Sequence, residues 1–455
     1  MSVIHNIFFF IIAIGVLVTF HEFGHYWVAR KFNVKVLKFS VGFGKPLYKW
    51  VRIHGEDTIE YIIASIPLGG YVKMLDEREG KVRDDDKPRA FNTQPVTTRF
   101  AIVIAGPAFN FILAIIFFWM VYLMGITATK PLLGPPVADS IAAQAGFESR
   151  DEILSVGGKS VQSWQEFRLS IIQQGLDGGV LSISVRDENS VEMIRKLDLG
   201  NMKLLEDERD VVKKIGFKQW WPSLPPTLGG LVEGGAASKS GLKEGDLIKS
   251  IDGTQITSWS QIVEVVKESP GKFLMFEVER EGEINVISVI PASREIDNKK
   301  SGFIGAYQQI PESLKQELIV ELEYGPVESI GLAIMKTWDT SILTLRVFSK
   351  IILGEASLKN ISGPVTIAQY AGLTASISFS VFIGFLAVIS VSLGVINLLP
   401  IPMLDGGHLF YYLIEIIKGS PVSESFEAKG QAVGIVLLGL LMFVALFNDF
   451  QRLMQ

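Results

Sequence analysis

Four stretches of the chain are long and apolar enough to cross a membrane as helices. Residues 100–129, 379–404 and 432–448 contain no Lys, Arg, Asp or Glu, and residues 4–28 contain only Glu22. The hydrocarbon core of a bilayer requires about 20 apolar residues in a helix. The pattern therefore predicts a multi-pass α-helical membrane protein with four transmembrane helices.

The first stretch has one alternative interpretation, a cleaved signal peptide. Such peptides carry basic residues before the apolar run and small residues at a cleavage site. Here Arg30 and Lys31 follow the apolar run, and no basic segment precedes it. We therefore expect an uncleaved membrane span.

A fifth apolar stretch, residues 331–354, has a different pattern. Hydrophobic side chains recur in it at helical spacing, and charged side chains interrupt it. The hydrophobic set is Ile334, Trp338, Ile342 and Leu345, and the charged set is Lys336, Asp339, Arg346 and Lys350. This pattern is typical of an amphipathic helix that lies on or against a membrane.

Composition adds a soluble part to this picture. The mean hydropathy of the 455 residues is +0.33, which is high for a soluble enzyme, yet 20% of the residues are charged, which is high for a bundle made only of membrane helices. The net charge of −5 indicates no basic surface of the kind that nucleic-acid binding requires, and no cluster of Lys and Arg with interleaved aromatic residues is found. There is no cysteine, so any metal must be held by His and carboxylate side chains.

Lys and Arg are distributed unevenly between the segments that connect the spans. Residues 29–99 hold 14 Lys or Arg against 9 Asp or Glu, whereas residues 127–320 hold 22 against 28. Basic loops stay on the cytoplasmic side of a membrane. Segment 29–99 is therefore expected in the cytoplasm, and both termini and segment 127–320 are expected outside.

Near the end of the first span the chain reads "HEFGH", which brings three ionisable groups to membrane depth. His21 and His25 are separated by four positions, so on a helix both imidazoles lie on one face and can bind one metal ion. Glu22 lies beside that face, where a carboxylate can take a proton from water at the metal. The alternative, two histidines that form interhelical hydrogen bonds, has less support because ionisable groups in membranes usually serve a function.

A hydrolytic zinc site requires three protein ligands and one open position. The candidate third ligand is Asp405 in "NLLPIPMLDGGH", where Pro400 and Pro402 end the third span and Gly406-Gly407 predicts a turn. With four spans, His21, His25 and Asp405 all fall near cytoplasmic helix ends. The alternative for Asp405 is a turn or capping residue.

These motifs together resemble the site-2 protease family of intramembrane zinc metalloproteases, in its regulator of sigma-E protease branch. The resemblance rests on "HEFGH", "GPAFN" (106–110) and "NLLPIPMLDGG", and it covers essentially the whole chain. It implies that His21, His25 and Asp405 bind Zn²⁺ and that Glu22 is the catalytic base. It also implies that Asn397 holds the substrate backbone near the metal and that Asn110 supports the site.

The other histidines are not expected to bind the metal. His408 would close the coordination shell that a hydrolytic zinc must keep open, so a supporting or packing role is expected for it. His5 and His54 lie in a terminus and a loop and are expected to be solvated.

An internal repeat lies between the second and third predicted spans. "AGFESRDEILSVGGKSVQSW" (145–164) matches "SGLKEGDLIKSIDGTQITSW" (240–259) at an offset of 95 residues, since 241 − 146 = 95. The two copies resemble tandem PDZ domains, which bind extended peptides by strand addition. Arg150 stands where the second copy has Gly245, which is expected to stiffen that turn. The pair either excludes bulky substrates by size or responds to a ligand, and the sequence leaves both open.

The first cytoplasmic loop is expected to form a membrane-associated β-hairpin. Hydrophobic and polar residues alternate in "VLKFSVGFG", and residues 58–74 are also rich in strand-forming side chains. A protease acts on an extended backbone, so an edge strand here is expected to hold an unwound substrate. The predicted substrate-binding residues are Tyr61, Ile62 and Ile63, with an ordinary solvent-facing hairpin as the alternative.

The predicted fold class is thus a four-span α-helical membrane protein with a membrane-associated β-hairpin and two inserted PDZ-like α+β domains. The expected domains are 1–126 and 373–455 for the spans, 127–221 and 222–310 for the two repeats, and 311–372 for amphipathic helices near the membrane. The expected activity is zinc-dependent cleavage of transmembrane segments.

By the same resemblance, the substrates are a trimmed anti-sigma factor and signal-peptide remnants. The expected location is the bacterial inner membrane, with the active site toward the cytoplasm and the PDZ-like pair in the periplasm. Membrane lipid is an expected partner and nucleic acid is not. The alternative is a non-catalytic zinc-containing scaffold that recruits partners through its PDZ pair; a zinc transporter is less well supported because no relay of acidic residues runs through the other spans.

Overall fold

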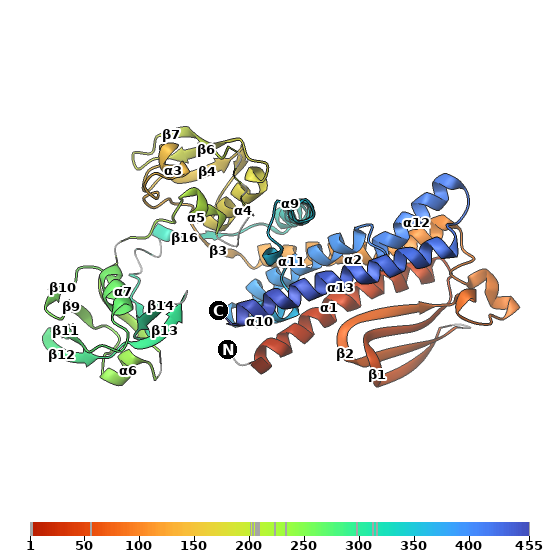
Figure 1. Ribbon diagram of the computed structural model, residues 1–455, viewed down its shortest axis with the longest axis horizontal. Helices are drawn as coiled ribbons and strands as arrows, with labels where there is room; N and C mark the ends of the chain where they lie inside the picture. Colours follow the sequence, from red (N-terminus) through yellow and green to blue (C-terminus); the bar gives the residue numbers. More distant parts are fainter. Residues whose placement is uncertain are drawn as a thin grey trace. The chain divides into compact units, whose positions relative to one another are not determined.

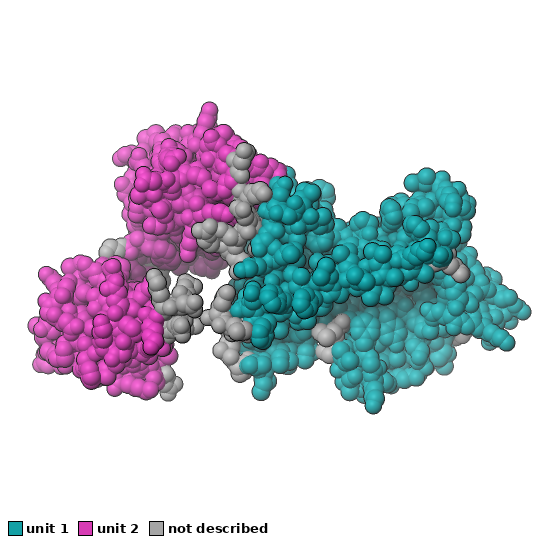
Figure 2. Space-filling view, viewed as in Figure 1, with its two compact units in different colours: residues 1–126, 205–208, 322–453 teal, residues 127–204, 209–321, 454–455 magenta. Residues whose placement is uncertain are grey.

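The computed structural model of the protein describes residues 3–54, 57–200, 202, 204, 210–222, 224–232, 234–296, 299–311, 314 and 317–454. The chain divides into two compact units (Figure 2). The first contains residues 1–126, 205–208 and 322–453, and the second contains residues 127–204, 209–321 and 454–455.

The first unit is a helical bundle with one β-hairpin (Figure 1). Its elements are α1 (Val3–Lys31), β1 (Val36–His54), β2 (Asp57–Met74), η1 (Glu77–Glu79), η2 (Asp84–Arg89), α2 (Val96–Leu123), α9 (Pro326–Ile352), η3 (Leu358–Asn360), α10 (Pro364–Ile377), α11 (Phe379–Leu398), α12 (Asp405–Lys418) and α13 (Glu424–Met454). Among the described residues, four helices are long and apolar enough to span a membrane, namely α1, α2, α11 and residues Ser425–Arg452 of α13. The prediction of four transmembrane helices is confirmed.

Two predicted spans end earlier than the apolar pattern suggested. Helix α2 ends at Leu123, and after Gly125, which has a φ of 76°, the chain continues as the strand β3 (Ile126–Thr129). Helix α11 ends at Leu398, because Pro400 and Pro402 follow directly. The length of an apolar run indicates which residues can lie in the membrane, whereas glycine and proline determine where the helix ends.

The predicted turn at Gly406-Gly407 is wrong, because both glycines lie in the first turn of α12, which begins at Asp405. Their small size serves packing rather than turn geometry. A Cβ added at Gly406 would lie 2.1 Å from the Leu399 carbonyl oxygen, and one added at Gly407 would lie 2.6 Å from that of Ile401. The glycines let α12 start immediately beside the end of α11.

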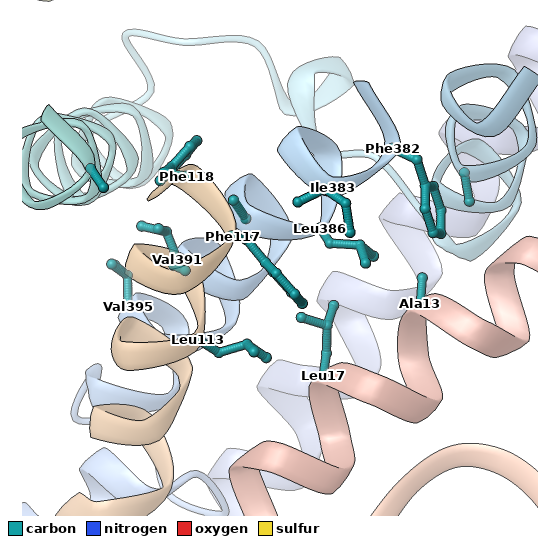
Figure 3. Close-up of a cluster of buried hydrophobic side chains, with 14 residues drawn as sticks. Ala13, Leu17, Leu113, Phe117, Phe118, Phe382, Ile383, Leu386, Val391 and Val395 are labelled. Atoms are coloured by element: carbon teal, nitrogen blue, oxygen red, sulfur yellow. The ribbon is translucent and has the colours of Figure 1, made fainter. Parts of the chain in front are cut away.

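Buried apolar side chains hold the bundle together in one cluster (Figure 3). Helices α1, α2 and α11 supply most of it, with single alanines from α9 and α10. The members are Ala13, Leu17, Leu113, Ala114, Phe117, Phe118, Ala333, Ala371, Phe382, Ile383, Leu386, Ala387, Val391 and Val395. Among the described side chains of α13, none belongs to this cluster.

Helix α9 turns small residues toward the protein. Ser329, Ala333 and Thr337 are its buried residues, whereas Ile334 and Trp338 of the predicted hydrophobic face are 50% and 66% exposed. The predicted hydrophobic face of α9 is therefore exposed on the first unit, and its contact with a membrane stays a prediction.

The start of α1 and the end of α13 lie at the same end of the bundle, away from the β-hairpin and α12 (Figure 1). A chain that crosses the membrane an even number of times has both of its ends on the same side. The end of α1 and the start of α12 consequently meet at the opposite end, as the four-span count predicted.

The hairpin of β1 and β2 folds back on itself, so that part of each strand is paired on both sides. Val41 lies opposite Gly70 on one side and Ile63 on the other, and Ile63 also lies opposite Tyr48. Across the sheet the segments follow in the order 66–74, 36–43, 57–64 and 46–54. Segments 66–74 and 46–54 therefore form the two edges.

The second unit contains two lobes of the same design, whose strand orders are β5-β4-β6-β7 and β10-β9-β11-β12. The first lobe contains α3 (Ile141–Gln144), β4 (Glu152–Val156), β5 (Lys159–Ser160), α4 (Trp164–Gly175), β6 (Val180–Arg186), β7 (Glu192–Asp198) and α5 (Val211–Ile215). The second contains β8 (Leu228–Leu231), α6 (Ala236–Ser240), β9 (Leu247–Ile251), β10 (Thr254–Gln255), α7 (Trp259–Glu268), β11 (Leu274–Arg280), β12 (Glu283–Val289), β13 (Ala292–Ile296), β14 (Lys299–Phe303) and β15 (Ala306–Gln308). Strand β16 (Ile319–Leu322) pairs with β3.

The 95-residue offset of the sequence repeat holds in the structure. Adding 95 to the bounds of β4 and β5 gives the bounds of β9 and β10. Arg150 adopts a φ of 70° where Gly245 adopts 89°, so the turn is the same in both copies. An arginine tolerates this left-handed conformation less readily than glycine does.

Candidate metal centre and active site

His21 and His25 lie one turn apart on α1, and both are buried, with 9% exposure each. Their Nε2 atoms are 3.3 Å apart, so both rings turn the same nitrogen toward one point. The apolar residues before them and the absence of proline keep α1 helical through the motif, as the i, i+4 spacing predicted.

Asp405 completes a cluster of three potential ligands. Its Oδ2 atom lies 3.2 Å from Nε2 of His21 and 3.5 Å from Nε2 of His25. Helix α12 is held in place by α2, to which it is joined by the ion pair between Arg99 and Glu415 at 2.6 Å. The structure thus brings together the three residues that the sequence predicted as metal ligands.

The spacing of these three atoms fits a zinc ion. Zinc binds nitrogen and oxygen ligands at about 2.0–2.1 Å, so neighbouring ligand atoms of a tetrahedral site lie about 3.3 Å apart. The three distances are 3.2, 3.3 and 3.5 Å. In addition, Oδ2 of Asp405 is buried and accepts no hydrogen bond from the described residues. The donor set therefore suits a metal ion better than a hydrogen-bonded triad.

Both histidines are oriented by groups on α2. The Nδ1–H of His25 donates to the carbonyl oxygen of Ile102 at 2.8 Å, which leaves Nε2 free to bind a metal. The side-chain Nδ2 atom of Asn110, which is fully buried, lies 3.0 Å from Nδ1 of His21. Rotating the amide by 180° would instead place Oδ1, which has no partner among the described residues, where it accepts the Nδ1–H of His21 and frees Nε2 in the same way.

Two glycines let α1 and α2 approach closely enough for these contacts. A Cβ added at Gly24 would lie 2.4 Å from the Ala105 carbonyl oxygen, and one added at Gly106 would lie 2.3 Å from Nε2 of His25. The motif "GPAFN" contained Gly106, but its role depends on the approach of two helices and was not predicted. Ile102, which orients His25 through its backbone, carries no sequence signal for that role.

Glu22 lies beside the cluster and faces the hairpin. A Cβ added at Gly70 of β2 would lie 3.0 Å from Cγ of Glu22, and the backbone of Val72 is within hydrogen-bonding reach of its carboxylate. Segment 70–74 is the edge of the sheet, and on its outer side the described residues supply no backbone partner. An unpaired strand edge therefore runs past the candidate catalytic carboxylate.

The predicted substrate-binding residues lie in the interior of the sheet. Tyr61, Ile62 and Ile63 are each paired with β1 on both sides, so their backbone groups are already engaged. Tyr61 instead ties the sheet to α1, because its hydroxyl lies 2.9 Å from that of Tyr26. Burial raises the pKa of Tyr61 to about 12, which keeps the hydroxyl protonated.

Asn397, which was predicted to hold the substrate, and His408, for which a supporting or packing role was expected, lie on either side of Asp405 in the chain. Asn397 is half-buried in the last turn of α11, shortly before the loop that carries Asp405. His408 lies in α12 one turn after Asp405 and does not belong to the three-residue cluster. The centroid of its ring lies 6.4 Å from that of Tyr411. Substrate binding by Asn397 and a supporting role for His408 stay predictions.

Four membrane-spanning helices with a buried His-His-Asp cluster and an adjacent glutamate define a membrane-embedded metalloprotease. The chain matches peptidase family M50 over residues 9–441 and belongs to that family. It is an intramembrane zinc metalloprotease of a bacterial inner membrane.

Individual relatives agree with this assignment over their full lengths. The regulator of sigma-E protease RseP of Salmonella typhimurium is 42% identical over 100% of both chains. The protein of the same name from Escherichia coli is 42% identical over 98% of both. A Vibrio cholerae relative whose name includes the words zinc metalloprotease is 40% identical over 99% of this chain and 100% of its own.

Proposed function

We propose that His21, His25 and Asp405 are the zinc ligands of this protease and that Glu22 is its catalytic base. The observation that carries the proposal is the convergence of the three ligand atoms at distances of 3.2–3.5 Å beside Glu22. When bound there, zinc supplies a Lewis acid that polarises the scissile carbonyl and makes water easier to deprotonate.

The protein's own groups perform the proton transfers. Glu22 takes a proton from the attacking water and delivers it to the amide nitrogen that leaves. Ile102 keeps the imidazole of His25 in the tautomer that leaves Nε2 free, and Asn110 would do the same for His21 with its amide oxygen turned toward Nδ1. Asn397 is proposed to hold the substrate backbone beside the cluster, and its place at the end of α11 supports that role.

The ligand assignment is tested by metal analysis of three single variants. His21→Ala, His25→Ala and Asp405→Ala each remove one of three ligands, so each is expected to lose most of the bound zinc. His408→Ala is the matched control, because His408 is near the cluster but outside it. Full zinc occupancy in Asp405→Ala would reject the proposed third ligand.

We further propose that the substrate binds as an added strand along residues 70–74. A helix engages its carbonyls in its own hydrogen bonds, so a transmembrane substrate must be unwound before cleavage. The unpaired edge beside Glu22 supplies backbone hydrogen-bond partners for such a strand. Segment 61–63 does not, because it is paired on both sides within the sheet. The proposed substrate contact is therefore the edge at residues 70–74 and not Tyr61, Ile62 and Ile63.

The names of the relatives support a role in a sigma-E response. We propose that the substrates are single-span proteins such as a trimmed anti-sigma factor and signal-peptide remnants. We also propose that the active site faces the cytoplasm and that segments 127–221 and 222–310 are periplasmic PDZ-like domains. The equal strand order of the two lobes supports the repeat, and size exclusion and ligand gating stay alternative roles for it. The scaffold alternative predicts no cleavage at all.

A further inference from the structure

Helix α13 contacts the loop before Asp405 and helix α12 through two glycines. A Cβ added at Gly434 would lie 2.2 Å from the carbonyl oxygen of Pro402 and 2.7 Å from its carbonyl carbon. A Cβ added at Gly430, one turn earlier, would lie 2.1 Å from the hydroxyl of Tyr411. The helix backbone therefore rests directly on the loop that leads into Asp405, with no room for a side chain.

That loop has a conformation that its own residues do not favour. Met403 adopts a φ of 83°, in the left-handed region that a non-glycine residue rarely occupies. Such a conformation persists only where the surroundings fix it. The loop is packed by Gly407 of α12 on the side of Ile401 and by Gly434 of α13 on the side of Pro402.

The rest of α13 offers little other packing near the site. Residues 435–444 include no buried residue, and a Cβ at Gly439 would meet no atom within 4 Å. The next firm contact is at the far end of the helix, where Asp449 accepts hydrogen bonds from the backbone N–H groups of Gly363 and Val365. Near the metal ligands, the helix is thus positioned by its two glycines and by the ring of Phe426, whose centroid lies 6.1 Å from that of Tyr411.

We infer that Gly430 and Gly434 are positioning residues for catalysis. They allow α13 to press on Pro402, which fixes the backbone of Met403 and thereby directs the carboxylate of Asp405 toward His21 and His25. The last membrane span then acts on the metal centre without supplying a ligand. This inference rests on the proposed role of Asp405 as a zinc ligand.

The first test compares Gly434→Ala with Gly439→Ala in the full-length protein. Alanine favours a helix more than glycine does, so neither change breaks α13, and only the first adds an atom against Pro402. We expect zinc affinity, measured by competition with a chelator, to fall about ten-fold or more in Gly434→Ala and to stay unchanged in Gly439→Ala. The absorption spectrum of the cobalt-substituted protein is expected to change in the first variant alone.

The second test uses the contact between Gly430 and Tyr411. The Tyr411 hydroxyl is buried and has no hydrogen-bond partner among the described residues, so Tyr411→Phe loses no hydrogen bond. Removing it leaves the ring carbon 3.3 Å from a Cβ at position 430. Tyr411→Phe is therefore expected to restore zinc affinity to Gly430→Ala but not to Gly434→Ala, whose obstacle is a backbone carbonyl.

The outcomes separate this inference from the proposed function. If Asp405→Ala keeps its zinc, the ligand assignment itself fails. If Asp405→Ala loses zinc while Gly434→Ala matches Gly439→Ala, the positioning role is wrong and the ligand assignment stands. If Gly434→Ala does not fold, the comparison of Gly430→Ala with the double variant Gly430→Ala, Tyr411→Phe tests the inference. Equal zinc affinity in these two proteins would then overturn it.

Discussion

Gly106 of α2 lies against His25 of α1, and a Cβ at that position would come within 2.3 Å of Nε2, the atom proposed to bind zinc. The same Cβ would also lie 2.8 Å from Cε1 of His21. Close approach of the two helices at this point is what lets Ile102 and Asn110 reach the histidine rings.

Gly106→Ala is therefore expected to displace both imidazoles and to weaken zinc binding about ten-fold or more, with a matching loss of cleavage. Metal analysis after exposure to a chelator measures the effect. Gly15→Ala is the control, because a Cβ at Gly15 of α1 meets no atom within 4 Å. Equal zinc retention in the two variants would show that the close approach does not matter.

Val72→Pro tests the proposed substrate edge. Proline removes one backbone N–H from the edge that faces Glu22 and touches no proposed ligand. Zinc binding should persist while cleavage of a reporter falls, and the loss should be greater for a substrate with a strongly helical span than for one loosened by Gly or Pro. The comparison is made by gel assay of the two reporters.

Ile62→Pro provides the contrast, since Ile62 is paired on both sides within the sheet. It is expected to damage the hairpin and to reduce cleavage of both reporters alike. If Val72→Pro also reduces both alike, the loss comes from damage to the hairpin or from the lost contact between the Val72 backbone and Glu22 and not from strand addition, and if it reduces neither, the substrate binds elsewhere.

Asp246 makes the second lobe sensitive to acid. Its side chain is fully buried, and burial alone would raise its pKa, but hydrogen bonds from Arg280 and from the backbone N–H of Lys243 outweigh burial and hold the pKa below its usual value. A carboxylate with a depressed pKa stabilises the fold above the pKa of the unfolded chain, about 3.9. That stabilisation is lost as the pH falls through the lower, folded-state pKa.

The free energy of unfolding of this lobe should therefore decrease as the pH falls below about 4. Urea unfolding followed by a hydrogen-exchange pulse at fixed pH, read at residues 247–280, measures it. In Asp246→Asn the lobe should be less stable at neutral pH, by about 3 kcal/mol for a broken buried pair, and less dependent on pH. An unchanged pH slope in that variant would assign the acid sensitivity to other groups.

Removing the repeat tests whether it restricts substrates. Strands β3 and β16 are paired, so the ends of a segment excised between them lie close and can be joined by a short Gly-Ser linker. A protein without residues 131–317 should keep its zinc and cleave untrimmed substrates that the intact protein rejects. Unchanged discrimination between trimmed and full-length substrates would argue against any filter.

The metal ligands could be predicted from the sequence because their geometry is local or carried by a motif. The spacing of His21 and His25 determines their common face on any helix, and the count of spans brings Asp405 to the same depth. The free edge of the hairpin could not be predicted in this way. Alternation predicts strands, but whether Ile63 or Val72 lies at an edge depends on long-range register.

The roles of several glycines were also out of reach. Gly106, Gly406 and Gly434 all lie within helices, and their importance arises from atoms of other parts of the chain that pack against them. The turn predicted at Gly406-Gly407 was wrong for the same reason. Glycine has two uses, an unusual backbone angle and close packing, and the sequence does not distinguish them.

Glu22 is proposed to perform acid-base chemistry at a zinc site built by other residues. The most direct test measures zinc content and cleavage of a single-span reporter by the wild type and Glu22→Gln in parallel. Because glutamine keeps the shape of the side chain but cannot take the proton, the variant should hold the same zinc and lose cleavage by about 10²-fold or more. Undiminished cleavage by a zinc-loaded Glu22→Gln protein would contradict the account.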